Sequence, residues 1–512
     1  MMGLGRTDNT MRLDDDLILG ARVLVGIDAR DRADWLEHAG VLVRKGVVVE
    51  VGGADELIAR YPSARISGGE NFVVMPGMVN SHHHVGLTPL QLGSIDHSLE
   101  TWFASRLALR EVDLELDTLF SAMEMIASGV TTVQHLQSRA PGDVQHVLTA
   151  AGAVVSAYCR IGMRVSYSMA FRDQNRIVYG DDAAFVASVP EPLRAPLGDY
   201  FARFTLPLED QVTVFEELRA RYHTDGLTKV QLAPANLHWL SDAALETVAR
   251  LSAEDATPMH MHVVETPYQQ EYARRRTGGT AVEYLARFGM LTPALTIGHG
   301  VWMSESDIRM SADAGVRVCH NCSSNMRLAS GRAPVLEMRA AGIDIAIGID
   351  EAGLNDDRDM LQELRLVSIS NRNPGIDEPR LTAAAVLRMA TVNGAATTGF
   401  AASIGELRPG RSADVVLLDW KAITYPFQNA NIPWEDVLVQ RAKSSAVHSV
   451  MIDGAWVMRD RVFTTVDRDA VLADIADRLD RAPTPAETAR TAFARSVETE
   501  VRSFYSGYLP RA

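Results

Sequence analysis

The feature that most constrains the fold is an alternation of short apolar segments with longer helical patterns, which begins near Met75. This alternation is typical of βαβ units, in which helices connect successive parallel strands. Eight candidate strands can be recognised: Val73–Val79, Val130–Gln134, Tyr158–Val165, Lys229–Ala233, Pro258–Val263, Leu295–His299, Val316–His320 and Ile343–Ile349. Eight strands of this kind predict an α/β fold with a closed (β/α)8 barrel of the TIM type rather than an open sheet.

Both ends of the chain are rich in short β-type segments, which fits a second domain in a chain of 512 residues. The segments are Ile18–Val25, Gly40–Val43 and Val47–Val51 before the barrel, and Ala413–Leu418 and Val447–Ile452 after it. We expect the two ends to pair in one small β-sandwich, into which the barrel is inserted. The predicted boundaries are 1–75 and 404–463 for the two parts of the sandwich, 76–403 for the barrel and 464–512 for a helical tail.

Composition excludes several classes of partner. The formal net charge of −15 argues against a nucleic-acid partner, which would require clustered Lys and Arg. No apolar run reaches the roughly 18 residues of a spanning helix, so no membrane association is expected. Met1–Asp16 lacks the basic and apolar regions of a secretory signal, and three cysteines are too few for a disulfide framework. The sequence therefore predicts a cytoplasmic protein that acts on a small molecule and forms a homodimer or a higher homo-oligomer.

The segment Asn80–His84 contains a His-x-His pair that follows an apolar strand. Alternate side chains of a strand share a face, so His82 and His84 point the same way and His83 points away. Two imidazoles at this spacing, near the carboxyl end of a barrel strand, can chelate one metal ion. A polar strand end with unrelated histidines is the alternative interpretation of this pair alone.

Three further strand ends carry ligand-type or acid–base side chains. His262 follows an apolar strand, and Glu265, three residues later, suits a general acid–base residue; a surface glutamate is the alternative. His299 and Asp350 end two other apolar runs. Burying an unpaired carboxylate is costly, so a cation would explain Asp350, although a helix N-cap would explain it as well. Taken together, four strand ends supply such side chains to one face of the predicted barrel, where barrel active sites lie.

The order of these motifs resembles the amidohydrolase superfamily from about Ile18 to Phe463. The segments that carry the resemblance are Pro76–His84, Gly129–Val133, His262–Thr266, His299–Gly300, Gly348–Asp350 and Gly405–Asp414. Within the superfamily, the chain is most similar to the branch of cytosine, guanine, 8-oxoguanine and S-adenosylhomocysteine deaminases and triazine hydrolases. The spacing of Glu265 from His262 and the run His320–Gly331 indicate this branch. The fourth strand ends without the lysine that bridges two metals in other relatives, so the resemblance implies one metal ion.

The resemblance assigns roles to these residues. It implies a divalent ion held by His82, His84, His262 and Asp350. Zinc suits three imidazoles and a carboxylate, with iron and manganese as alternatives. Asp350 would also accept a proton from the metal-activated water, His299 would orient the water or polarise the substrate, and Glu265 would carry a proton to a ring nitrogen and then to the leaving group.

The expected reaction is the hydrolytic deamination of a small amino-substituted heteroaromatic ring: a purine, pterin, pyrimidine or triazine. The first alternative is an enzyme of the same fold that cleaves an amide, urea, carbamate or C–Cl bond, and the second is a non-catalytic binding protein. Candidate substrate contacts are Gln91, Trp239, Asn325 and Met326. Many members of the branch have arginine at the position of Gln91, so the sequence lowers the expectation of an anionic substrate group there.

Overall fold

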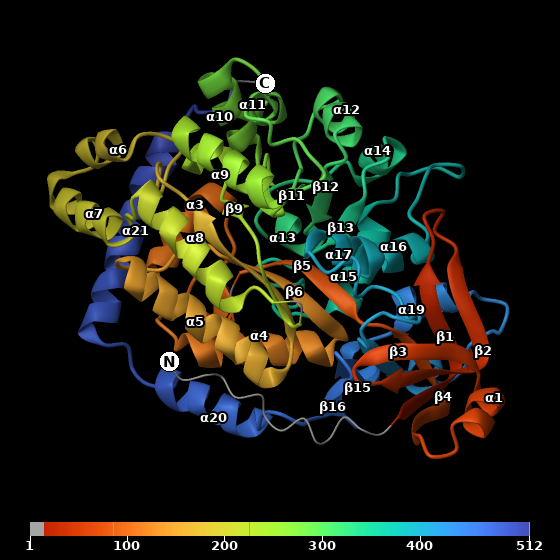
Figure 1. Cartoon of the computed structure of the whole chain (residues 1–512). Helices are drawn as coiled ribbons and strands as arrows, with labels where there is room; N and C mark the ends of the chain where they lie inside the picture. The colour runs from red at the N-terminus through yellow and green to blue at the C-terminus, as the bar shows by residue number, and fades with distance from the viewer. Residues whose placement is uncertain (1–14, 85, 225, 511–512) are drawn as a thin grey trace.

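The computed structural model describes residues 15–84, 86–224 and 226–510. The strands of the two chain ends form one eight-stranded sheet in the order β17-β16-β15-β14-β4-β1-β2-β3. Their bounds are β1 (Asp16–Ile27), β2 (Ala33–Arg44), β3 (Val47–Gly53), β4 (Arg65–Pro76), β14 (Val415–Asp419), β15 (Val447–Ile452), β16 (Ala455–Arg459) and β17 (Val462–Phe463). In Figure 1 these red and blue strands gather at one corner of the molecule.

The N-terminal and C-terminal strands meet at β4 and β14, which pair antiparallel from Val415 opposite Pro76 to Asp419 opposite Phe72. Val74, Val415 and Leu417 belong to one buried apolar cluster with Ile18 and Val41. The β-branched and apolar side chains of both chain ends are therefore buried together, and the predicted pairing of the two ends is present in the sheet.

The remaining strands are parallel. They are β5 (Met78–His83), β6 (Val130–Gln137), β7 (Arg164–Phe171), β8 (Thr228–Val230), β9 (Ala233–Pro234), β10 (Met259–Val263), β11 (Leu295–His299), β12 (Arg317–His320) and β13 (Ile345–Ile347). They form two sheets, β5-β6-β7-β8 with β9 on β7, and β10-β11-β12-β13. Parallel bridges Leu232–Met259 and Asn236–His262 join the first sheet to the second, and His83–Asp350 joins β13 back to β5. Parallel neighbours therefore follow chain order around a continuous path.

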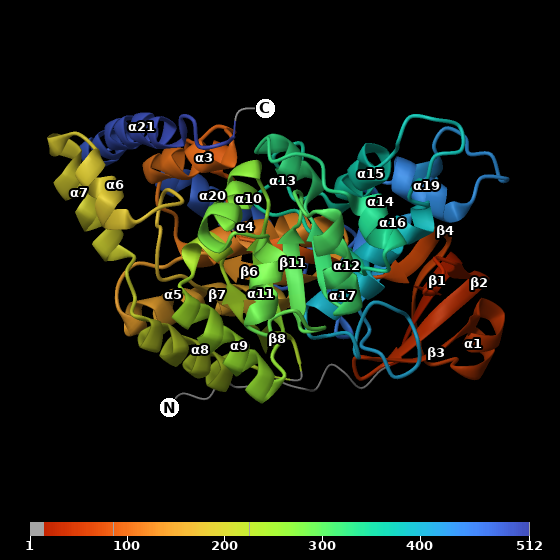
Figure 2. The same cartoon turned by 90° about the horizontal axis from the view of Figure 1, so that it is seen from above.

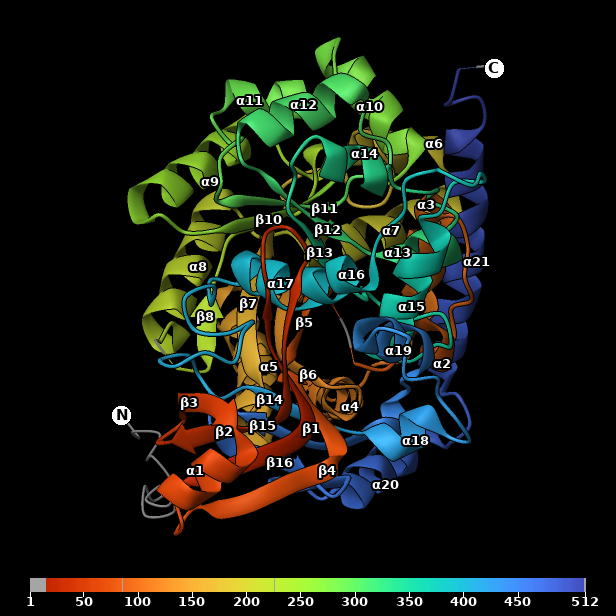
Figure 3. The same cartoon turned by 90° about the vertical axis from the view of Figure 1, so that its right-hand side faces the viewer.

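Helices connect these strands. The main ones are α4 (Leu114–Ala127), α5 (Val144–Ile161), α8 (Leu208–Tyr222), α9 (Asp242–Asp255), α10 (Pro267–Thr277), α11 (Ala281–Arg287), α12 (Glu305–Asp313), α14 (Val335–Ala340), α15 (Met360–Ser370), α16 (Ala383–Ala390) and α17 (Val392–Thr397). Helices α8 to α12 arch around the outside of the strands in Figure 3. Helix α5 shows the reason: Val147, Ala151, Val154 and Tyr158 recur at helical spacing and are buried.

Three predicted strands differ from the structure, one of them Lys229–Ala233, which is divided between β8 and β9. Tyr158–Val165 was expected to be extended, but α5 continues to Ile161 and β7 begins only at Arg164. Gly162 ends the helix in a left-handed conformation with φ of 82°. The buried end of the helix and the following strand form one apolar run, which periodicity alone cannot divide. The expected strand Val73–Val79 is likewise divided between β4 and β5 around Gly77.

The predicted helical tail forms α20 (Arg468–Leu479) and α21 (Pro485–Tyr505). Figure 2 shows α21 beside α3 (Leu99–Ser105), on the side of the molecule away from β1–β4. Among the described helices, none combines the length and apolarity needed to cross a lipid bilayer. The prediction about a secretory signal concerns residues that lie mostly outside the described part of the chain.

Candidate metal centre and catalytic site

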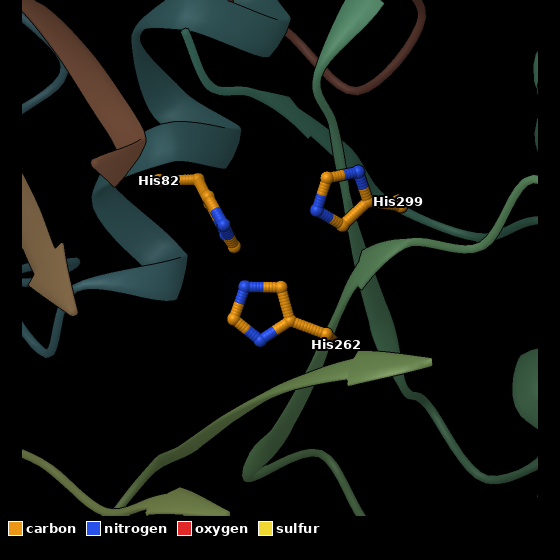
Figure 4. A group of neighbouring side chains, drawn as sticks. All are labelled: His82, His262 and His299. Atoms are coloured by element: carbon orange, nitrogen blue, oxygen red, sulfur yellow. The ribbon is translucent and has the colours of Figure 1, made fainter. Parts of the chain in front are cut away.

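The predicted ligands lie at the carboxyl ends of parallel strands. His82 is the next-to-last residue of strand β5 and His84 follows the strand, His262 is in β10, and Asp350 follows β13. The structure brings their donor atoms together in groups that could hold a metal ion, one with His82, His84 and Asp350 and another with His82, His262 and His299. Figure 4 shows the rings of His82, His262 and His299 turned toward a common space.

Four donor atoms converge closely. The Nε2 atom of His84 lies 3.0 Å from Nε2 of His82 and 3.1 Å from Nε2 of His262. Asp350 Oδ1 lies 3.3 Å from Nε2 of His84 and 3.6 Å from Nε2 of His82. Donors held about 2.0–2.1 Å from a tetrahedral zinc ion lie about 3.3–3.4 Å from one another. The separations therefore fit one tetrahedral ion.

The other ring nitrogens show which atoms carry lone pairs. His84 Nδ1 donates to the carbonyl oxygen of Leu136 at 2.6 Å, and His262 Nδ1 donates to that of Ala235 at 2.8 Å. A neutral imidazole has one N–H, so both Nε2 atoms present lone pairs to each other. Burial holds the pKa of His262 well below its ordinary value, which favours the neutral ring. Converging lone pairs repel unless a cation lies between them, and the donor set therefore fits a metal ion.

Two glycines allow His82 to reach this position. A Cβ atom on Gly348 would lie 2.5 Å from His82 Cβ and 2.4 Å from Asn321 Oδ1. A Cβ atom on Gly298 would lie 3.1 Å from His82 Cε1 and 3.2 Å from His260 Nε2. The contacts at Gly348 are too close for a Cβ atom, and those at Gly298 are tight, so the small residues before His299 and Asp350 make room for the ligand from β5.

The site also contains backbone in unusual conformations. His299 and Asp350 adopt left-handed φ values of 69° and 65°, and Val264, beside Glu265, has φ of 43°. Such conformations cost of order 1–3 kcal/mol each and persist where the surroundings fix them. Here they turn the chain at the end of each strand, so that the side chains face the common space.

Asp350 and Glu265 are both buried, and their surroundings differ. Asp350 Oδ2 accepts a hydrogen bond from Ser324 Oγ at 2.6 Å, which leaves Oδ1 toward the histidines. Glu265 Oε1 accepts from Ser330 Oγ at 3.2 Å and lies 3.7 Å from His299 Nδ1. Burial raises the pKa of Glu265 to about 7, and Asp350 adds to the rise while His299 opposes it. Glu265 is thus poised to hold or release a proton near neutral pH.

The alternative interpretations of the two acids do not fit the structure. Glu265 is 3% exposed and is no surface residue. Asp350 caps no helix, because Asp359 caps α15, the helix that follows. His299 is held from both sides, with Nδ1 2.9 Å from Asn325 Oδ1 and Nε2 3.2 Å from Asn321 Nδ2. Sequence analysis proposed Asn325 as a substrate contact; the structure places it against His299 instead.

A further group of donors, His82, His260 and Cys319, lies on the other side of the His82 ring. His260 Nε2 is 2.8 Å from Nδ1 of His82. Burial raises the pKa of the Cys319 thiol well above its ordinary value, so the thiolate that a metal needs is disfavoured. We therefore interpret His260 as the partner that orients His82, a role that sequence parity alone could not assign.

A pocket of about 780 Å³ opens onto these residues. Its walls include His84, His262, Glu265, His299 and Asp350, together with Leu99, Trp102, Phe103, Arg106, Arg139, Arg172, Arg176, Ile177, Tyr200, Asn236, Trp239, Gln269, Leu328 and Glu351. Trp239, a candidate substrate contact in the sequence analysis, lies in this wall, and the contact itself stays a prediction. Gln91 and Met326 are exposed and do not line the pocket; Gln91 instead caps α2 (Pro89–Leu92) through Thr88.

Sequence analysis missed the four arginines of this wall. Arg106 lies just after α3, Arg139 follows β6, and Arg172 and Arg176 follow β7. They occur singly in connecting segments, so no motif marks them. Only their positions could have indicated a place in the pocket wall: three follow predicted barrel strands, and Arg106 lies in the long connection after the first barrel strand.

Comparisons with known proteins agree with this arrangement. A sequence model of the amidohydrolase family matches residues 73–457. The chain is 30% identical over 451 residues to a 5-methylthioadenosine/S-adenosylhomocysteine deaminase of Acetivibrio thermocellus, covering 87% of this chain and 94% of the relative. It is also 30% identical over 451 residues to an 8-oxoguanine deaminase of Pseudomonas aeruginosa, covering 86% and 94%.

Solved structures show the same fold. An adenosine deaminase from Xanthomonas campestris, solved with bound zinc, superposes with a TM-score of 0.77 at 25% identity and covers 92% of this chain and 99% of its own. A mutant atrazine chlorohydrolase from Arthrobacter aurescens, solved with zinc and atraton, gives a TM-score of 0.76 at 22% identity over 90% and 99%. The resemblance inferred from the motifs, and with it the expectation of a hydrolase acting on C–N bonds, is confirmed.

Proposed function

Because the chain belongs to the amidohydrolase family, we propose that it hydrolyses the C–NH2 bond of a small amino-substituted heteroaromatic ring and releases ammonia. The observation that carries the proposal is the convergence of three imidazole Nε2 atoms and Asp350 Oδ1 beside a buried glutamate whose pKa is about 7. The deaminases among its relatives support the same reaction class.

His82, His84, His262 and Asp350 would hold one divalent ion, and zinc suits this donor set best. When bound, such an ion supplies a nucleophile at neutral pH by lowering the pKa of water to about 7. Asp350 Oδ2 and the nearby His299, whose Nε2 is 3.8 Å away, are placed to accept a proton from the attacking water and to hold its orientation.

Glu265 would move the protons. Attack on an aromatic C–NH2 carbon interrupts the ring's aromaticity, so a ring nitrogen must gain a proton as the C–O bond forms. Glu265 lines the pocket, and with a pKa of about 7 it can both hold and release that proton near neutral pH. It then passes a proton to the amino group, which leaves as ammonia while the carbon becomes a carbonyl. The net reaction consumes one water for each ammonia released.

Trp239, Phe103 and Trp102 give the pocket aromatic walls, which suits a flat ring. Phe103 and Trp239 pack edge to face with ring centroids 5.3 Å apart.

For the fold, we infer that the path of parallel strands is the (β/α)8 barrel and that the eight-stranded sheet is the satellite domain of residues 1–75 and 404–463. A homo-oligomeric state remains a prediction.

The proposed reaction is tested by an ammonia-release screen with the purified, zinc-loaded protein. Amino-purines, pterins, pyrimidines and triazines are compared with matched amides, ureas, carbamates and chlorides. We expect ammonia from at least one ring amine, and release from a Glu265→Gln variant that is slower by a factor of about 10²–10⁴ under the same conditions. Cleavage of amide, urea, carbamate or C–Cl substrates without ammonia from any ring amine would assign the enzyme to the alternative class.

A further inference from the structure

The pocket wall contains four arginines, which differ in whether an acid pairs with them. Two of its four arginines are neutralised: Arg106 Nη1 lies 2.7 Å from Glu351, and Arg176 Nη1 lies 2.6 Å from Asp182. Arg139 and Arg172 form no ion pair with any acid of the described residues. Two cations without acidic partners therefore face the space in which the substrate must bind.

The side chain of Arg172 is held in place by an aromatic ring and by backbone carbonyl groups. Its guanidinium lies over the ring of Trp239, 4.3 Å from the ring centroid, and Nη2 donates to the carbonyl oxygens of Asn175 and Arg176. The Nε atom is shielded from solvent and has no hydrogen-bond partner. Burial lowers the pKa of Arg172 to about 9, and the charge of Arg139 adds to the decrease. Keeping the Arg172 guanidinium charged in this buried position therefore costs free energy.

Arg139, which follows strand β6, lines the same pocket as Arg172. Its guanidinium lies 4.8 Å from the ring centroid of Phe204 and 5.6 Å from that of Tyr200, and Nη1 donates to the Tyr200 hydroxyl. These contacts fix the group without neutralising it. Both arginines line the pocket of the candidate metal centre, and both also line an adjoining cavity that is mostly apolar. They stand where the two spaces meet.

We infer that Arg139 and Arg172 form an anion-binding subsite, and that the substrate carries a carboxylate or phosphate group on an arm attached to its ring. The inference rests on the proposed function for the ring itself. Planar guanidinium groups bind such anions through paired N–H donors, and a bound anion would offset both the desolvation of Arg172 and its repulsion by Arg139. Gln91 lowers the expectation of an anionic group only at its own position, and this is compatible with the subsite because Arg139 and Arg172 come from other strand ends.

The subsite is tested with three adenine derivatives that share a propyl arm on N9 and differ only at its end: a carboxylate, a phosphonate or the neutral primary amide. Hydrogen bonds to charged groups contribute about 1.5–3 kcal/mol, which corresponds to roughly 10- to 100-fold in kcat/KM. We expect the wild-type enzyme to prefer one of the anionic compounds over the amide by this factor, and the preferred arm identifies the anion. Arg139→Gln and Arg172→Gln should remove the preference, measured within each variant as the ratio of kcat/KM for the anionic compound to kcat/KM for the amide.

Arg203→Gln is the matched control. Arg203 also lies over the Phe204 ring, 5.7 Å from its centroid, but it is exposed and lines no part of the pocket. This variant should keep the preference. Equal turnover of the amide and both anionic compounds by the wild type would overturn the inference.

A binding measurement separates the subsite from the reaction. Inorganic phosphate at millimolar concentration should raise the thermal unfolding temperature of the wild type and of Arg203→Gln, and not that of Arg172→Gln. Arg172→Lys keeps the positive charge but lacks the paired N–H donors of a guanidinium group. Phosphate should therefore stabilise this variant less than it stabilises the wild type. Phosphate stabilisation without deamination of any ring amine would refute the proposed function and support the subsite, whereas stabilisation unaffected by Arg139→Gln and Arg172→Gln would refute the subsite.

Discussion

Glu265 is distinguished from other acids of the chain by its position rather than by its pKa. Glu363, on α15, is also buried, and burial raises its pKa to about 7 as well. Glu363 accepts a hydrogen bond from the backbone N–H of Ser323 and does not line the pocket. The two residues therefore separate the effect of a buried, protonatable glutamate from the effect of one placed beside the candidate metal centre.

Substitution Glu265→Gln should lower kcat by a factor of about 10²–10⁴, the usual contribution of general acid–base catalysis. The metal content should not change, because Glu265 is proposed to lie outside the ligand set. Glu363→Gln, the control, should retain most activity. Steady-state kinetics and metal analysis of both variants check this prediction, and loss of the metal in Glu265→Gln would show that Glu265 is a ligand.

The pH dependence of kcat/KM should reflect the raised pKa of Glu265. The protonated form is the proton donor, and it is lost as pH rises through about 7. The rate should therefore decrease above neutral pH, approaching a tenfold loss per pH unit. A profile that rises steadily to pH 9 would exclude protonated Glu265 as the required form.

Among single residues, the predicted ligands could be assigned to one site because each lies at the end of an apolar strand, and the structure brings these strand ends together. That they hold a metal ion stays a prediction. His260 and the two unpaired arginines could not be predicted in the same way. The role of His260 depends on its contact with His82 across two strands. Arg139 and Arg172 lie in segments after strands, and only tertiary packing brings their side chains together.

At the scale of elements, helix α21 supports the wall of the pocket. Val497, Val501 and Tyr505 on this helix share a buried apolar cluster with Ile177 and Val178, which follow β7. The Tyr505 hydroxyl accepts a hydrogen bond from the backbone N–H of Tyr179 at 3.0 Å. The tail that sequence analysis could assign only as helix thus holds the segment that carries Arg172 and Arg176.

Tyr505→Phe should destabilise the protein by about 1–3 kcal/mol, because it leaves the buried N–H of Tyr179 without an acceptor. The matched control is Tyr508→Phe, a tyrosine of the same cluster whose hydroxyl takes part in no hydrogen bond described in the structure. Thermal unfolding of both variants measures the difference. Equal unfolding temperatures for the two variants would show that the Tyr505 contact contributes no stability.

Whether the bounds of an element could be predicted depends on how it is buried. An element buried on one face has a visible hydrophobic period, whereas one buried on all sides does not. Strand β11 matches its predicted range, Leu295–His299, residue for residue. The junction of α5 and β7 was misassigned because the helix end at Tyr158 and Ile161 is as buried as the strand that follows. The pairing of the two chain ends was expected from the β-rich segments at both ends, and β4 pairs with β14 in the structure.

At the scale of the whole molecule, one buried ion pair joins the parallel strands to the eight-stranded sheet. Arg164 of β7 contacts Asp414, next to β14, with Nη2 2.9 Å from Oδ1 and Nε 3.2 Å from Oδ2. The two side chains are 1% and 3% exposed. Asp414 also accepts from the N–H of Asp453 and its carbonyl accepts from Gly77, so the pair lies where four segments meet.

Arg164→Met should destabilise the protein by about 3–5 kcal/mol, because removal of one partner leaves a buried charge uncompensated. Arg250→Ala, which breaks an exposed pair with Glu254 on α9, should cost less than about 1 kcal/mol. The midpoints of urea unfolding check both values. An Arg164→Met protein as stable as Arg250→Ala would contradict the proposed importance of this junction.

The number of metal ions per chain tests the account most directly, since the ligand geometry, the role of Glu265 and the proposed reaction all depend on it. We predict one divalent ion, zinc, per chain of the wild-type protein by elemental analysis, and far less than one in Asp350→Asn and His262→Ala purified in parallel. Two ions per chain would contradict the single site inferred from the donor atoms. Full activity of the wild type after exhaustive chelation, with no metal detected, would contradict the account as a whole.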